Sequence, residues 1–490
     1  MGLLMLMLGC GEGADYNLQL VPIVPENQLP FDGLTRIDLV VEHADGSEEA
    51  YTLDELSGSP ALGEMGALEG GTIAVKGYSG TALSAFGRSQ PITLQTGKLE
   101  APVLVASTEQ VGWFPTMDTP LVGGAVVAID GVFWVFGGDT KRMDYGVAGS
   151  TEGSNLVRAI DLTGPDALTL TAQDYTMPDN GTGTDTWAGS TATLLQDGRV
   201  LIAGGGPSLD YMENDALAQA VLFDPSTGTF SELLDLEEAR VDHQAVPFHN
   251  GDVALISGIS ASNAIRQIEI YRAADDSIEP AAQLGTFNPS AAPLGLEGIL
   301  ICGGMDLGDE AFTDECFILD FSGNLSDAAP LPAPRGALQL TQLTDGLVLA
   351  TGGASVNGEA ETDAWLYDVA EDAWTEAGPL NIARARHKTV PLPDGSALVI
   401  GGAAELQPNT LPVPGGDQIS CVERFDPTDQ SFAVLDGCTA SDSSGGTPNA
   451  VINPSVASDL RYGVLIIGGA ESERLAAVDD LSFFPAVPGE

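Results

Sequence analysis

Seven short glycine-rich signals recur along this chain of 490 residues. Each follows a short apolar run and ends in a glycine pair, except the third, in which Ser257 stands before Gly258. Most intervals between them are about 50 residues, which indicates an array of repeated supersecondary units. This recurrence constrains the architecture before any catalytic residue is considered. The signals are Val135–Gly138, Ile202–Gly205, Ile256–Gly258, Ile301–Gly304, Ala350–Gly353, Val399–Gly402 and Ile466–Gly469.

A further glycine precedes each signal and marks a hairpin turn. Asp-Gly and Asn-Gly pairs supply the positive φ that tight two-residue turns require. The apolar runs beside these turns are too short for helices and too continuous for half-exposed strands, so they predict buried strands. The glycine pairs suit places where backbones pass closely or φ turns positive. The turn pairs are Asp130-Gly131, Asp197-Gly198, Asn250-Gly251, Glu297-Gly298, Asp345-Gly346, Asp394-Gly395 and Tyr462-Gly463.

Bulky residues follow most signals in pairs that bracket a polar turn, which predicts a third and a fourth strand. Large apolar side chains are usually buried, so packing between neighbouring units is the simpler interpretation and a ligand platform the alternative. The pairs are Phe223 with Phe230, Tyr271 with Ile278, Tyr367 with Trp374 and Phe425 with Phe432.

This pattern resembles the kelch-repeat β-propeller over residues 105–490. The resemblance implies four-stranded blades, and seven signals imply seven of them. Two places depart from the family pattern. Ser257-Gly258 replaces a glycine pair, and Leu319-Asp320 lacks the aromatic residue. After Gly469 only one clear strand remains, whereas residues 111–115 form a strand without a blade. We therefore expect this segment to complete the last blade, because an open ring would expose strand edges.

Residues 16–104 lack the repeat and show alternating segments separated by turn residues. This pattern predicts a small β-sandwich of immunoglobulin-like size in front of the propeller. No long segment has helical periodicity, so the chain is expected to be all-β.

Residues 1–15 resemble the signal and linker of a bacterial lipoprotein. Leu3 to Leu8 are apolar, and Gly9 precedes Cys10, the residue that lipid would modify. No basic region precedes the apolar stretch, and that stretch is too short to be a transmembrane helix. The alternative is an uncleaved apolar tail with a chance cysteine. The resemblance implies export to the bacterial cell envelope, with a lipid anchor in the outer membrane or periplasm.

The four other cysteines form two local pairs, Cys302 with Cys316 and Cys421 with Cys438. Adjacent antiparallel strands bring Cα atoms within disulfide range, so two bridges are expected, in agreement with an oxidising compartment. A zinc site is disfavoured, because the histidines show no ligand spacing. His243 and His387 each follow an arginine by three residues, which favours equivalent packing roles over catalysis.

The chain carries 70 acidic and 18 basic residues, for a formal net charge of -52. Nucleic acid is excluded as a partner, because phosphate contacts need Lys and Arg. The charge suits either a solvated acidic surface or cation binding. Within residues 179–185, the side chains of Asp179, Asn180 and Asp185 offer oxygen ligands suited to calcium, although the loop is not an EF-hand.

Five long insertions fall between strands two and three or between blades, which predicts that they share one propeller face. They are residues 139–156, 175–187, 206–218, 403–419 and 438–456. Function on rigid scaffolds concentrates in such loops, although insertions are also tolerated without a ligand. The candidate contacts are Asp139, Lys141, Arg142, Asp144, Tyr145, Trp187 and Tyr211.

Catalytic motifs are missing from the sequence: it has no Gly-x-Ser-x-Gly and no His-Glu-x-x-His. The copper-radical galactose oxidases are kelch propellers, but that resemblance implies axial tyrosines and histidines and a free cysteine, whereas the cysteines of this chain pair. We therefore expect a lipid-anchored binding protein that recognises a protein or glycan without catalysis. Two alternatives stay open: a carbohydrate-active enzyme with axial acids, and a structural envelope component.

Overall fold

The computed structural model is nearly all β, and its described part contains no α-helix, only the short 3-10 turn Gly295–Glu297. It describes residues 6–9, 16–23, 28, 31–53, 70–89, 91–93, 97–108, 112–114, 123–138, 153–161, 170–180, 186–207, 216–260, 263–306, 308–309, 311–343, 346–406, 414–419, 421–435, 451–452, 455–459, 461, 463–467, 470–471 and 481–486. No helix in these segments is long and apolar enough to cross a membrane.

Between residues 112 and 485, the described strands form antiparallel sheets that succeed one another along the chain. In each of the first three, sequence order is also spatial order from the inner to the outer strand. The first sheet contains β9 (Ala125–Ile129), β10 (Val132–Phe136), β11 (Leu156–Asp161) and β12 (Leu170–Thr176); the second β13 (Thr191–Leu194), β14 (Val200–Ala203), β15 (Gln219–Asp224) and β16 (Thr229–Phe230), with β17 (Leu234–Asp235) beside β15; the third β18 (Gln244–Pro247), β19 (Val253–Ile256), β22 (Gln267–Arg272) and β23 (Ser277–Gln283).

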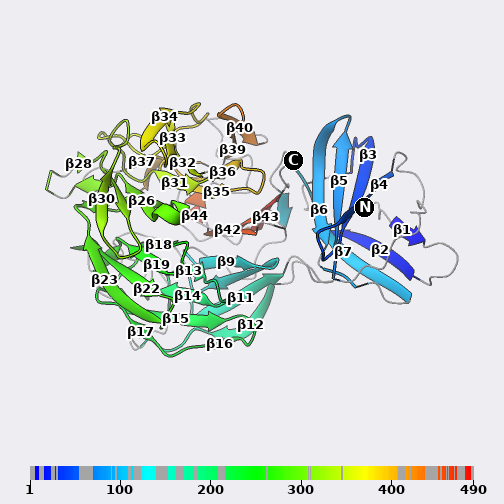
Figure 1. Ribbon diagram of the computed structural model, residues 1–490, viewed down its shortest axis with the longest axis horizontal. Helices are drawn as coiled ribbons and strands as arrows, with labels where there is room; N and C mark the ends of the chain where they lie inside the picture. The colour runs from blue at the N-terminus through cyan, green and yellow to red at the C-terminus, as the bar shows by residue number, and fades with distance from the viewer. Residues whose placement is uncertain are drawn as a thin grey trace.

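The next three sheets repeat this order. The fourth contains β25 (Ser290–Pro293), β26 (Ile299–Cys302), β29 (Cys316–Leu319) and β30 (Leu325–Ala328); the fifth β31 (Gln339–Gln342), β32 (Leu347–Thr351), β33 (Ala364–Asp368) and β34 (Ala373–Glu376); the sixth β35 (Lys388–Pro391), β36 (Ala397–Ile400), β39 (Val422–Asp426) and β40 (Ser431–Leu435). Each inner strand packs beside the inner strand of the next sheet. Figure 1 shows these sheets side by side around a common centre, a propeller-like arrangement.

The last sheet contains β42 (Ser455–Asp459), β43 (Gly463–Ile467), β45 (Leu481–Pro485) and β8 (Gly112–Phe114). Its fourth strand therefore comes from before the first sheet, with Trp113 opposite Ser482, as the sequence predicts. The inner strand β42 packs beside β9. Two hydrogen bonds join the same sheets: the Ser455 hydroxyl donates to the Gly124 carbonyl at 2.6 Å, and the Gly131 amide donates to the Asp459 carboxylate at 2.8 Å.

The glycine pairs make close contact between successive sheets possible. Gly352 and Gly353 follow β32 with φ of 53° and 90°. A Cβ on Gly352 would lie 2.3 Å from the carbonyl oxygen of Arg384 in the next sheet. The amide of Gly353 donates to that same carbonyl at 2.9 Å. The pair thus allows a backbone hydrogen bond between sheets that larger residues would block.

Small strands extend the connections that follow the second strands and, at Thr286–Phe287 and Val451–Ile452, the segments that enter the inner strands. They are β20 (Ile259–Ser260) with β21 (Asn263–Ala264), β27 (Met305–Asp306) with β24 (Thr286–Phe287) and β28 (Ala311–Phe312), β37 (Ala403–Leu406) with β38 (Pro414–Gln418), and β41 (Val451–Ile452) with β44 (Ala470–Glu471). Isolated bridges tie these connections to the residues that enter each inner strand, such as Val241 with Ile259 and Ala385 with Ala403. The connections after the second strands and the segments that enter the inner strands therefore lie on one face of the ring, which we call the insertion face. The β-turns between first and second strands lie on the opposite face.

The N-terminal region differs from the predicted sandwich. Its described strands hydrogen-bond into one seven-stranded sheet instead of two, in the order β1 (Leu6–Gly9), β2 (Tyr16–Ile23), β7 (Gly97–Ser107), β6 (Ala82–Ser89), β5 (Thr72–Ser79), β3 (Arg36–Glu42) and β4 (Glu48–Leu53). The strands β2 and β7 pair in parallel. Alternation identifies a strand with one buried face, but it does not identify the strand beside it.

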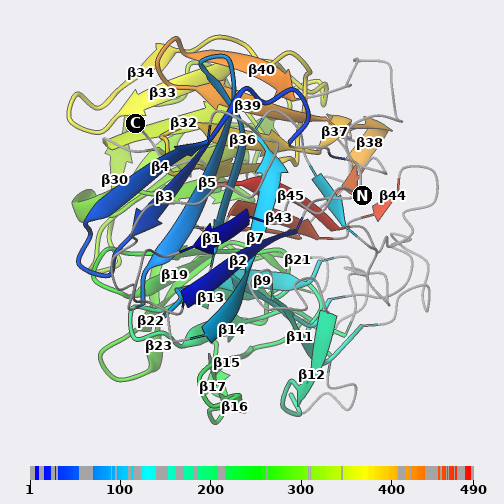
Figure 2. The same ribbon diagram turned by 90° about the vertical axis from the view of Figure 1, so that its right-hand side faces the viewer.

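This sheet lies beside the ring where the ring closes (Figure 2). Ala106 of β7 is fully buried in one apolar cluster with Phe133 of the first sheet and Phe483 of the last. Arg88 of β6 donates to the carbonyl of Arg461, in the turn between β42 and β43, at 3.3 Å. That turn belongs to the face opposite the insertion face. The N-terminal sheet therefore leaves the insertion face uncovered at this contact.

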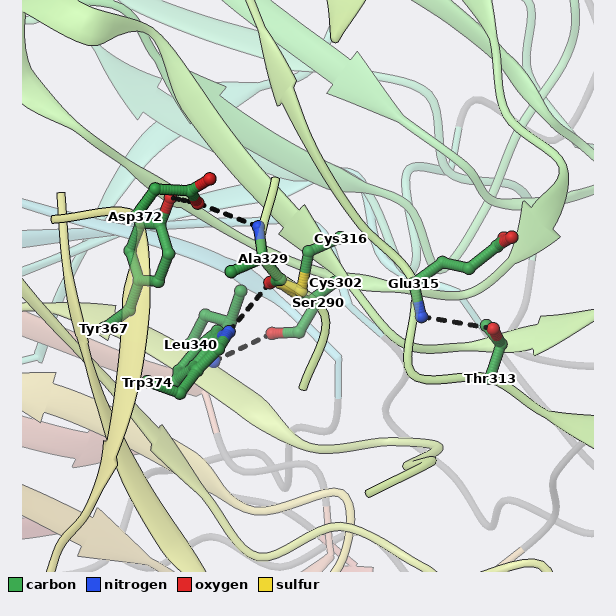
Figure 3. The surroundings of a disulfide bond; sticks show 10 residues. All are labelled: Ser290, Cys302, Thr313, Glu315, Cys316, Ala329, Leu340, Tyr367, Asp372 and Trp374. Atoms are coloured by element: carbon green, nitrogen blue, oxygen red, sulfur yellow. Dashed lines mark hydrogen bonds between the residues drawn. A yellow bond between two sulfur atoms is a disulfide. The ribbon is translucent and has the colours of Figure 1, made fainter. Parts of the chain in front are cut away.

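Aromatic residues of the third and fourth strands pack within and between sheets, as predicted. Tyr367 and Trp374 are opposite each other, with ring centroids 5.0 Å apart. The Trp374 indole donates to the Ala329 carbonyl of the preceding sheet at 2.9 Å. Figure 3 shows these residues beside the predicted disulfide between Cys302 and Cys316, which joins β26 to β29 inside the same apolar cluster.

Candidate functional site

A cavity of about 460 Å³ lies at the centre of the ring. Its described walls come from the ends of all seven inner strands and from the residues just before them. Because these entry residues bridge to the connections after the second strands, the cavity belongs to the insertion face. We call it the axial pocket. Its size is in the range of pockets that take small molecules.

Left-handed residues surround the axial pocket at one repeated position. In six sheets the residue two places before the inner strand has a positive φ and lines the pocket. A positive φ costs little for glycine or asparagine, but it strains alanine and arginine. The strained backbone turns each entry segment toward the axis in the same way. These residues are Gly123, Gly189, Asp242, Asn288, Ala337 and Arg386.

Three charged residues line the described part of the pocket: Asp242, Arg386 and Lys388. Asp242 enters the third sheet, whereas Arg386 and Lys388 enter and begin the sixth, so the pairing spans the ring. A guanidinium nitrogen of Arg386 lies 3.6 Å from a carboxylate oxygen of Asp242. The Arg386 side chain is 9% exposed and that of Asp242 is 31% exposed. These three residues together carry a net positive charge, whereas the whole chain has a formal net charge of -52.

Lys388 lines the pocket, and it is exposed to solvent there. Desolvation lowers the pKa of Lys388; the charge of Asp242 opposes this shift and the charge of Arg386 reinforces it. The remaining polar wall consists of neutral groups, including the hydroxyls of Ser190, Thr191 and Ser455 and the amides of Gln244 and Gln339.

Buried arginine–glutamate pairs hold the entry segments of the third and sixth sheets. Arg384 donates to the carboxylate of Glu423 at 2.7 Å and to the carbonyls of Gly401 and Cys421 at 2.8 and 2.9 Å. Both charged side chains are fully buried. Arg240 and Glu269 make the equivalent pair at 2.5 Å in the third sheet. The residue two places after each arginine is a charged pocket residue, so these pairs fix the positions of Arg386 and Asp242.

The histidines next to the charged pocket residues are structural. The Nε2 atom of His387 lies 2.8 Å from the Thr351 hydroxyl, and that of His243 lies 2.9 Å from the Thr191 hydroxyl. Burial, reinforced by the charge of Arg240, lowers the pKa of His243 to about 3. Burial also holds the pKa of His387 well below its ordinary value. Both imidazoles are neutral and packed between sheets, which agrees with the packing role favoured by the sequence.

The described pocket wall does not fit two kinds of catalytic centre. Asp242 is its one carboxylate, whereas glycoside hydrolysis ordinarily uses two. The described wall contains no tyrosine, and each of its two histidines is hydrogen-bonded to a threonine hydroxyl. The described residues also contain no group of three His, Cys, Asp or Glu side chains that could hold a metal ion. These residues therefore do not form a copper site of the galactose-oxidase kind.

The structure places only some of the predicted contact residues. The structure corrects the prediction that Trp187 is a contact residue. Its side chain is fully buried and packs in the core between the first two sheets. It occupies the position before the inner strand that Arg240 and Arg384 occupy elsewhere, which explains its burial. The other candidates lie outside the described residues: Asp139, Lys141, Arg142, Asp144, Tyr145 and Tyr211.

The predicted calcium loop is described only at its start. Asp179 is exposed, and the buried Asn180 amide donates to the Thr186 carbonyl at 2.8 Å, across the base of the loop. Asp185 lies outside the described residues, so calcium binding stays a prediction. Cys421 is disulfide-bonded, while its expected partner Cys438 and the predicted lipidation residue Cys10 also lie outside the described part.

Sequence reasoning missed the pocket residues Asp242, Arg386 and Lys388. A signal for them exists in the sequence: Arg240 and Arg384 each stand three residues before a histidine, and the pocket residue lies between them. Aligning the repeats on the inner strands would have placed Asp242 and Arg386 at one equivalent position.

Comparison with known proteins shows the fold alone. No family model and no curated protein matches the chain. A solved structure described as a novel fungal alcohol oxidase of the AA5 family, in complex with copper, is 15% identical, with a TM-score of 0.53 over 77% of this chain and 76% of that one. The structure of YjhT is 15% identical, with a TM-score of 0.45 over 66% of this chain and 99% of that one. The first likeness supports a β-propeller-like fold for this all-β chain.

Proposed function

We propose that this chain is a seven-bladed kelch-type propeller with a small N-terminal β domain, which acts as a binding protein of the bacterial cell envelope. It recognises a protein or glycan through the insertion face. One observation carries the proposal: the axial pocket opens on the same face as the extended connections. A rigid ring thus presents a recessed site surrounded by loops, which is the usual arrangement of binding sites on such scaffolds.

The position of the N-terminal sheet supports the proposed anchoring. This sheet contacts the ring at Arg461, on the face opposite the pocket. A lipid on Cys10 would therefore attach the chain through that side and leave the insertion face free. The strand Leu6–Gly9, just before Cys10, is an edge strand, so removal of a signal would leave the other six strands of the sheet paired. The disulfide of Cys302 and Cys316 agrees with an oxidising compartment outside the cytosol.

A carbohydrate-active enzyme is the weaker alternative. The likeness to the fungal alcohol oxidase concerns the fold, and the described pocket wall lacks both the acid pair of a glycosidase and a copper ligand set. The pocket has instead the neutral polar wall and the few charged groups that a binding site needs.

The test is crosslinking capture from intact cells. Wild-type protein is compared with a variant in which residues 139–156 and 403–419 are shortened, and with a variant in which the exposed turn 44–47 is replaced by Gly and Ser. We expect a partner that the wild type and the turn variant both capture and the shortened variant does not. Equal capture by all three would place recognition elsewhere. Labelling with a radioactive fatty acid, lost in Cys10→Ser, tests the anchor separately.

A further inference from the structure

We propose that the axial pocket binds the carboxylate group of a small ligand, through Arg386 and Lys388. This inference deepens the proposed function, on which its biological meaning rests, by naming the chemistry that the pocket selects.

The first argument is the local reversal of charge. The chain has 18 basic residues against 70 acidic ones, yet two of the three charged residues in the described pocket wall are basic. At physiological ionic strength, exposed charges are screened beyond about 8 Å. An anion inside the pocket therefore responds to Arg386 and Lys388 more strongly than to the distant acidic surface.

The second argument is that a carboxylate already occupies part of this position. The Asp242 carboxylate, from the third sheet, lies 3.6 Å from the Arg386 guanidinium, from the sixth. A guanidinium presents several donors in a planar fork that matches a carboxylate. A ligand carboxylate that enters from the insertion face can therefore contact the same guanidinium, and Asp242 competes with it.

The third argument concerns Lys388. Its ammonium group reaches pocket water, and it makes no ion pair within the part of the chain that the structure describes. Desolvation lowers the pKa of Lys388, and a nearby anion favours the charged form of an amine. A carboxylate bound beside this exposed ammonium group therefore gains an attractive partner.

The backbone around the three charges is built to hold them in place. The buried pair of Arg384 with Glu423 fixes the segment that carries Arg386 and Lys388. The pair of Arg240 with Glu269 fixes the segment that carries Asp242. Gly123 and Gly189, which enter the first and second sheets, contribute no side chain to the wall. This leaves room beside the charged pair for the rest of the ligand.

The experiment titrates the full chain with defined probes by calorimetry at physiological salt. The probes are glucuronate, its neutral counterpart glucose, N-acetylglutamate and inorganic phosphate. We expect binding of a carboxylate and none of glucose; the two carboxylates distinguish a sugar acid from an amino-acid source. Lys388→Met should weaken carboxylate binding about tenfold or more, since a charge-assisted hydrogen bond is lost. Lys76→Met removes the same charge from the N-terminal sheet and should leave binding unchanged.

Asp242→Asn should change carboxylate affinity in the direction opposite to Lys388→Met. Without the competing negative charge, carboxylate affinity should rise several-fold, whereas a merely structural role for Asp242 predicts no gain. Raising the pH through the lowered pKa of Lys388 should weaken binding in the wild type and not in Lys388→Met. Thermal melting first establishes that each variant is folded.

The proposal would be overturned by equal affinity in Lys388→Met and Lys76→Met, by glucose binding as tight as that of glucuronate, or by tighter Lys388-dependent binding of phosphate. Failure to bind any carboxylate would also overturn it. Partner capture that depends on the shortened loops would then still support the insertion face, so the two proposals fail separately.

Discussion

At the residue scale, the most consequential groups are the buried ion pairs beneath the pocket. Glu423 accepts hydrogen bonds from Arg384 and from the Asn381 amide and side chain. Glu423→Ala leaves a buried guanidinium without its partner, so we expect a loss of about 3–5 kcal/mol in the free energy of unfolding. Denaturant melts measure it. The double variant Arg384→Met with Glu423→Leu should recover most of that loss, because no uncompensated charge remains.

A surface pair provides the control for this prediction. Arg272 contacts Glu279 at 3.3 Å, and the Glu279 side chain is 60% exposed. Glu279→Ala should cost less than about 1 kcal/mol, because the exposed carboxylate contributes little and Arg272 keeps its ion pair with Asp252 at 3.0 Å. An equal loss in Glu279→Ala and Glu423→Ala would contradict the importance that we assign to burial.

His243 and His387 predict an acid-sensitive stability. Burial, then the charge of Arg240, lowers the pKa of His243 from 6.5 to about 3. Between these pH values the unfolded chain binds a proton that the folded chain does not, so stability is complete above about pH 6.5 and falls as the pH falls. We expect the free energy of unfolding to drop less between pH 7 and pH 5 in the variant His243→Gln with His387→Gln than in the wild type. Equal pH dependence would mean that other groups dominate in this range.

At the scale of the elements, the glycine pairs determine how closely the sheets approach. A Cβ at position 352 would meet a backbone oxygen at 2.3 Å, in a left-handed conformation with φ of +53°. Gly352→Ala must therefore displace the next sheet, and we expect a loss of at least about 2 kcal/mol, as for other overpacked sites. Gly285→Ala is the control, because no atom lies within 4 Å of its Cβ position and its φ is not positive. Thermal melts should show a lower midpoint for Gly352→Ala alone.

Much of the structure at the scale of the elements could be predicted from the sequence, because the signals are local. The turn glycines, the glycine pairs and the Cys302–Cys316 bridge all depend on residues close together within one sheet. The pairing partner of a strand is not local, and for that reason the N-terminal region forms one sheet where two were expected. Trp187 was misplaced because aromatic residues near a long loop resemble contacts, whereas its repeat position assigns it to the core.

The axial pocket could not be predicted from residue types for the same physical reason. Asp242 and Arg386 lie far apart in the sequence and become neighbours only because the ring brings the third and sixth sheets to one axis. The sequence analysis instead favoured the long loops, where polar residues are conspicuous. The pocket and the long connections share one face, but the described residues that form the pocket were not among the candidates.

At the scale of the whole molecule, ring closure depends on β8, a strand of three residues paired with β45. Its loss exposes the edge of β45 and separates the last sheet from the chain that precedes the first. We expect replacement of residues 111–115 by Gly and Ser to lower the melting temperature and to speed hydrogen exchange in β43 and β45 first. The hydrogen bond of Ser455 with Gly124 alone does not replace a strand, because it joins the two sheets only at the inner strand. The same replacement at the exposed turn 44–47 is the control. If exchange in β43 and β45 were unchanged, the inner strands would be sufficient to hold the ring closed, and β8 would not be the strand that closes it.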